Sequence, residues 1–95
     1  MANRIYNESS YIEGLRRAAK QAILCQAYDS ATILLDLGLS YGFPEGLPKE
    51  ALFLWDAKLA LDIAKLTIDK PEYFTDPSKL WEETMNEACL LLGVE

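Results

Sequence analysis

The chain has 95 residues, the size of one domain, and 51% of them are hydrophobic, which argues against intrinsic disorder. Fifteen acidic and nine basic side chains give it a net charge of −6. Non-specific binding to nucleic acid or to an anionic membrane requires a positive field, so both are disfavoured.

The chain is expected to begin with a loose arm over residues 1–9 and a first helix over 11–26. Ser10, with Glu13 three residues later, matches the capping-box pattern that begins helices. Apolar residues recur on one face at helical spacing. The inward face is predicted to hold Tyr11, Ile12, Leu15, Ala18, Ala19, Ala22 and Ile23. The outward face carries Glu13, Arg16, Arg17 and Lys20.

A second helix is predicted over residues 30–41. The phase of the apolar stripe changes near Tyr28, and Asp29 or Ser30 is a suitable N-cap. The alternative is one bent helix over 11–41. This segment is apolar around most of its circumference, with a polar face restricted to Thr32, Asp36 and Ser40.

Residues 15–44 resemble a single helix pair of the tetratricopeptide-repeat family. Tyr28, Ala31 and Leu35 match the start of that family's second helix. Gly38 stands where the family has alanine, Pro44 falls one place late, and the first helix lacks the family's Trp and Leu-Gly signature. No second repeat follows at the family's period of about 34 residues. The resemblance implies an α-hairpin, and true membership would imply peptide binding on a concave face.

A loop over 42–48 separates this pair from a central helix over 48–69. Gly42 suits a helix C′ position and Pro48 the first turn of the next helix. One apolar stripe of the central helix comprises Leu52, Trp55, Leu59, Ile63 and Leu66. A second arc comprises Phe53, Ala57, Ala60, Leu61, Ala64 and Ile68. A narrow charged strip comprises Lys58, Asp62, Lys65 and Asp69. We expect this strip to face solvent, with Lys58 paired with Asp62 and Lys65 with Asp69, four residues apart on the helix. A helix apolar on two sides is expected to be covered on both, with Trp55 in the core.

A loop over 70–76 leads to a last helix over 77–92. Asp76-Pro77 is an N-cap followed by an N1 proline, and Gly93 ends the helix. This helix is predicted to bury Leu80, Trp81, Thr84, Met85, Ala88, Leu91 and Leu92. Since no strand of useful length is evident, the fold class is all-α: a small single-domain bundle of four helical segments.

The residue types present exclude several chemistries. The chain has no histidine, which removes Ser-His and Cys-His nucleophile pairs and the commonest metal ligand. It also lacks a phosphate-binding glycine motif and an EF-hand loop. We therefore expect no enzyme activity, no metal and no cofactor. The start of the chain has no apolar signal region, and no run of about 20 apolar residues is present. These features favour a cytoplasmic location, with Cys25 and Cys89 as reduced, small buried hydrophobes.

Three surfaces are candidates for recognition. Every arginine lies in the first 17 residues, and Arg16, Arg17 and Lys20 share one helix face suited to carboxylate or phosphate. Tyr73 and Phe74 lie in a short loop between prolines, typical of interface anchors. The acidic candidates are Asp76, Glu82, Glu83 and Glu87. For each surface, a purely structural or solvated role is the alternative.

The leading hypothesis is a small acidic protein-binding module. It would act as a regulator, inhibitor or adaptor of bacterial or phage type by occluding a partner protein's surface. A second hypothesis is a homo-oligomeric scaffold subunit, a homodimer in the simplest case, that completes its apolar burial across a two-fold axis. A third is a nucleic-acid-associated protein that uses the basic face of the first helix.

Overall fold

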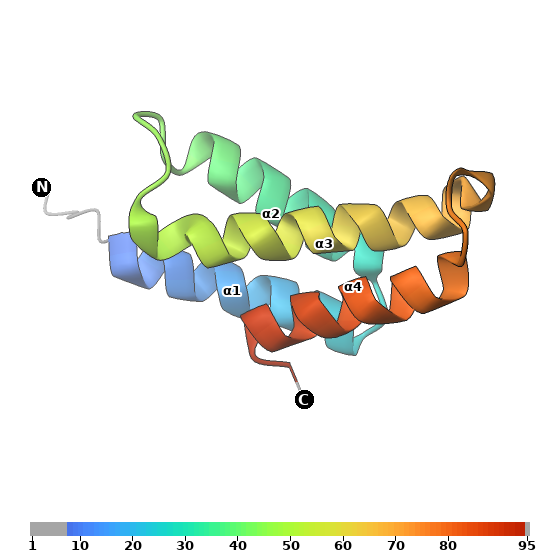
Figure 1. Ribbon diagram of the computed structural model, residues 1–95. Coiled ribbons are helices and arrows are strands. Elements are labelled where there is room, and N and C mark those ends of the chain that lie inside the picture. Colours follow the sequence, from blue (N-terminus) through green and yellow to red (C-terminus); the bar gives the residue numbers. More distant parts are fainter. Residues whose placement is uncertain (1–7, 95) are drawn as a thin grey trace, which may run out of the picture.

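The computed structural model describes residues 8–94 and shows four helices packed into a bundle (Figure 1). No strand occurs within that range, so the predicted all-α class is confirmed. α3 packs most extensively against α4, and α1 against α2. The four α-helices are α1 (Glu8–Leu24), α2 (Tyr28–Tyr41), α3 (Leu52–Asp69) and α4 (Pro77–Leu92), with short 3-10 turns at Lys49–Ala51 and Pro71–Tyr73.

α1 begins at Glu8, earlier than predicted, and the capping-box prediction is wrong. Ser10 lies inside the helix, and the Glu13 carboxylate accepts hydrogen bonds from Arg16 and Arg17. The predicted loose arm is therefore wrong for Glu8 and Ser9, and residues 1–7 lie outside the described part of the chain.

α1 and α2 are separate helices, so the alternative of one bent helix over 11–41 is wrong. The Gln26 N–H donates to the Ile23 carbonyl at 2.9 Å, and the Ala27 N–H donates to the Ala22 carbonyl at 2.8 Å. With Gln26 at a φ of 61°, this is a Schellman motif that ends α1 at Leu24 rather than at Gln26. α2 then begins at Tyr28 with Ala27 at the N-cap and no side-chain cap, so the predicted capping role of Asp29 or Ser30 is also wrong.

The loop after α2 is confirmed, but Gly42 is needed for a different reason from the predicted one. Its backbone is right-handed, with a φ of −80°, so it is not a left-handed C′ residue. A Cβ atom at Gly42 would overlap the ring of Tyr11. That ring packs edge-to-face on the buried Phe43, with ring centroids 5.4 Å apart. Residues 49–51 form the 3-10 turn, so α3 starts at Leu52 rather than at 48.

α4 matches the predicted bounds of 77–92. The Asp76 carboxylate caps it by accepting a hydrogen bond from the Lys79 N–H at 3.2 Å. Gly93 adopts a φ of 76°, and the Val94 N–H donates to the Cys89 carbonyl at 2.7 Å. Both helix ends therefore follow the local residue pattern.

The core forms from one face of each helix and contains small residues on α3. Ala57, Ala60 and Ala64 are buried as predicted, which allows a neighbouring helix to approach closely. The largest fully buried side chains are Leu35, Leu54, Leu61 and Leu92. Leu54 was not among the residues predicted to pack.

The prediction that α3 is covered on two sides is wrong. Its bulky stripe faces solvent, and Trp55, predicted to be in the core, is 37% exposed. Ile68, placed on the buried arc, is 64% exposed near the end of the helix. A helix in a four-helix bundle contacts its neighbours on one side only, and the alanine-rich side permits the closer packing. The stripe left outside comprises Leu52, Trp55, Leu59, Ile63 and Leu66.

The two cysteines are both free thiols. Cys25 is exposed, so its predicted burial is wrong. Cys89 is partly buried, and this burial raises the pKa of its thiol.

Candidate binding surfaces

The basic face of α1 is largely occupied by contacts within the chain. Arg16 donates from Nη2 to the Glu13 carboxylate at 2.6 Å and from Nη1 to the Leu92 carbonyl at 2.9 Å. Arg17 also reaches Glu13, at 3.3 Å, and Lys20 is partly buried. The hydrogen bond from Arg16 lowers the pKa of Glu13 and raises that of Arg16. Arg16 thus ties α1 to the end of α4 instead of presenting a free guanidinium.

The acidic candidates lie along α4 but do not form a cluster. Glu82, Glu83 and Glu87 are all exposed, whereas Asp76 is engaged as the N-cap. Among the described residues, no group of three or more His, Cys, Asp or Glu side chains is placed to hold a metal ion. This surface offers dispersed negative charge and no convergent site.

The loop aromatics take different positions. Tyr73 ends the short 3-10 turn with 66% of its surface exposed. Phe74, the next residue, is partly buried. The structure therefore leaves one aromatic ring of the pair available at this end of the bundle.

The most extensive apolar exposure lies on α3 and the adjacent α2. The five bulky residues of the α3 stripe are each 37–48% exposed. On α2, Ile33 is 57% exposed and Leu37 is 47% exposed. Monomers rarely expose contiguous apolar patches of more than a few hundred Å² without a functional reason. We call this set the apolar face: Ile33 and Leu37 on α2, and Leu52, Trp55, Leu59, Ile63 and Leu66 on α3.

A row of ion pairs joins α2 and α3. Lys58 Nζ lies 3.0 Å from Asp62 and 3.6 Å from Asp36, and 5.0 Å from the centre of the Trp55 ring. The hydrogen bond to Asp62 raises the pKa of Lys58. Only 15% of the Lys58 side chain is exposed, so the expected solvated strip is partly buried. The Lys58–Asp62 pair is confirmed.

The second ion pair of this row differs from the predicted one. Lys65 pairs with Asp29 at 3.3 Å, across the helix contact, instead of with Asp69. Both interhelical pairs, Lys58 with Asp36 and Lys65 with Asp29, show the antiparallel register of α2 against α3. Sequence reasoning missed these contacts because partners on different helices have no fixed spacing along the chain.

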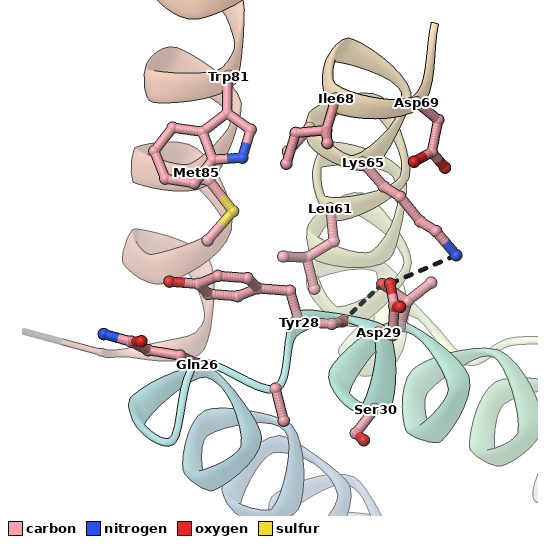
Figure 2. A pocket seen from close by; sticks show the side chains of 13 residues that line it. Gln26, Tyr28, Asp29, Ser30, Leu61, Lys65, Ile68, Asp69, Trp81 and Met85 are labelled. Atoms are coloured by element: carbon pink, nitrogen blue, oxygen red, sulfur yellow. Dashed lines mark hydrogen bonds and ion pairs between the residues drawn. The ribbon is translucent and has the colours of Figure 1, made fainter.

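A pocket of about 330 Å³ opens where α2 begins, between α3 and α4 (Figure 2). The rings of Tyr28 and Trp81 meet edge-to-face across it at 6.4 Å, beside Met85. The Asp29–Lys65 ion pair lies at its edge, so these two charged groups satisfy each other. The volume is at the lower limit for small-molecule sites, and the lining is mainly apolar.

Comparison with known proteins gives no assignment: no family description, curated protein or solved structure matches the chain significantly. The tetratricopeptide resemblance therefore stays a resemblance of one helix pair. Within residues 8–94, no helix is both long and apolar enough to cross a membrane.

Proposed function

We propose that the protein is a protein-interaction module whose binding surface is the apolar face. The observation that carries the proposal is the row of five bulky apolar residues that α3 leaves in solvent. A few residues near the centre of an interface supply most of the binding energy, and tryptophan is prominent among them. Trp55 lies within this row, with the Lys58 ammonium over its ring.

This proposal retains the regulator, inhibitor or adaptor role but changes the surface that performs it. The apolar face of α3 would block the partner's surface by complementary shape and apolar burial instead of by charge. The basic face supports a nucleic-acid role less well, since Arg16 and Arg17 are both paired with Glu13. No catalytic role is assigned to any residue.

The test compares three forms of the immobilised chain in lysate of the organism that carries it. The unmodified chain should retain a stoichiometric protein. Leu59→Asp combined with Ile63→Asp should lose it, because charges replace the centre of the apolar face. Glu82→Lys combined with Glu83→Lys is the matched control on exposed α4 and should retain it. Circular dichroism must show that all three forms are equally helical.

If the α3 variant still binds the partner and the α4 variant does not, the acidic surface of α4 is the binding surface. Salt gives a second criterion, because apolar contacts persist at high ionic strength whereas contacts between exposed charges weaken. A partner released by salt alone would contradict the proposal.

A further inference from the structure

We propose that the apolar face is covered by a second copy of this chain, in an antiparallel dimer. The two-fold axis crosses α3 at Leu59 and passes level with Leu35 of α2. The inference rests on the proposed function and names the partner of the same surface.

The α3 stripe is symmetric about Leu59. Leu52 and Leu66 lie seven residues on either side of Leu59, and Trp55 and Ile63 lie four residues on either side. At the helical rise, these pairs stand about 10 Å and about 6 Å from Leu59. In an antiparallel dimer centred on Leu59, the Leu59 side chains of the two copies therefore meet. Trp55 of one copy lies opposite Ile63 of the other, and Leu52 lies opposite Leu66. A two-fold interface requires this self-complementarity, and an unrelated partner does not.

The exposed apolar residues of α2 are symmetric about the same axis, independently of the α3 stripe. The ion pairs Lys58–Asp36 and Lys65–Asp29 show the register of the two helices, and that register places Leu35 level with Leu59. Ile33 and Leu37, the exposed α2 residues of the apolar face, lie two residues on either side of Leu35. The same axis therefore brings Ile33 of one copy opposite Leu37 of the other.

The charged edge of α3 beside the stripe is compatible with the same axis. The two-fold axis lies in the plane of the interface and is perpendicular to α3. It therefore places the α2-facing edge of α3 in one copy beside the α2-facing edge of α3 in the other. The edge of α3 nearest α2 carries two lysines and two aspartates, so it is neutral although the chain carries −6. Lys58 of one copy falls within about 3 Å, measured along the helix, of both Lys58 and Asp62 of the other, so like and opposite charges meet equally. This edge of α3 therefore adds no net charge beside the apolar contact.

The apolar face is large enough to be compared with known interfaces. At roughly 200 Å² for a fully exposed large apolar residue, the exposed fractions give on the order of 600 Å² of apolar surface per copy. The ion-paired row between α2 and α3 adds polar surface to the same face. Stable interfaces bury about 600–1,000 Å² per partner, so the apolar part of this face alone reaches the lower end of that range.

The test begins with the mass of the purified chain, measured by light scattering across micromolar concentrations. We expect a dimer. Leu59→Glu should give a folded monomer, with a dissociation constant of the dimer at least tenfold higher, because two carboxylates would face each other at the axis. Glu83→Lys, on exposed α4, should leave the dimer intact. Higher salt should preserve or strengthen the dimer, since it screens the repulsion between two chains of −6.

A cross-link tests the position of the axis. In a background of Cys25→Ser and Cys89→Ala, Leu59→Cys should form a disulfide between copies under mild oxidation, because only a residue at the axis meets itself. Glu83→Cys in the same background should not. A monomeric chain, a dimer that survives Leu59→Glu, or a disulfide at position 83 but not at 59 would each overturn the inference.

These outcomes are separable from those of the proposed function. The chain could prove monomeric and bind a different protein that the double variant Leu59→Asp, Ile63→Asp no longer retains. That result would overturn the dimer but support the proposed interaction module. A monomeric chain whose partner binding is unchanged by those substitutions would overturn both the dimer and the proposed function.

Discussion

Replacing Gly14 and Gly42 by alanine should change stability in opposite directions, although the chemical change is the same. Gly14 lies in the interior of α1, and a Cβ atom there would meet nothing within 4 Å. Close packing therefore does not explain this glycine. Alanine at that position should stabilise the fold by about 0.5–1 kcal/mol, because glycine has a higher entropy in the unfolded chain.

Gly42→Ala should destabilise, because its Cβ atom would overlap the ring of Tyr11. The ring cannot retreat freely, since its hydroxyl donates to the Gly38 carbonyl at 3.0 Å and its edge packs on Phe43. Overpacking costs about 1–3 kcal/mol and a lost hydrogen bond about 1 kcal/mol. The right-handed backbone accepts alanine, which returns about 0.4–1 kcal/mol through the unfolded state. The net expectation is a loss of about 1–3 kcal/mol.

Urea unfolding followed by circular dichroism measures both variants against the parent chain. All samples must have one protein concentration, because self-association would shift the midpoints. At an m value of about 1.5 kcal/mol/M, the two midpoints should differ by more than about 1 M. A Gly42→Ala chain as stable as the parent would refute the reasoning, because the Tyr11 ring would then be free to move.

Two further predictions concern the contacts of Arg16. Arg16→Ala should cost about 1–2 kcal/mol by breaking the charge-assisted bond to the Leu92 carbonyl, whereas the exposed Arg17→Ala should stay within about 0.5 kcal/mol in the same urea assay. Because the pKa of Glu13 is lowered in the folded chain, its contribution is present above its ordinary pKa of 4.5 and disappears as the pH falls through the folded value. Unfolding curves at a series of acidic pH values should therefore show a weaker pH dependence for Glu13→Gln than for the parent, and identical slopes would contradict the pairing.

Several features of the fold follow from local residue pattern alone. Asp76, Pro77 and Gly93 define the ends of α4 because capping depends on residues adjacent in the chain. The apolar periodicity of the other segments gave the all-α class and the number of helices. The end of α1 was missed because Gln26 adopts the left-handed conformation, which glycine or asparagine ordinarily signals.

The choice between the two apolar sides of α3 required the tertiary structure. Periodicity shows that a side is apolar, but not which side the neighbouring helices cover. Packing selected the side with Ala57, Ala60 and Ala64, since small residues allow close approach, and this left Trp55 and Leu59 in solvent. The partners of Lys58 and Lys65 on α2 were decided in the same way, by the register of packed helices. Local sequence thus determined where the helices lie along the chain, and packing between distant segments determined which surface remains available for binding.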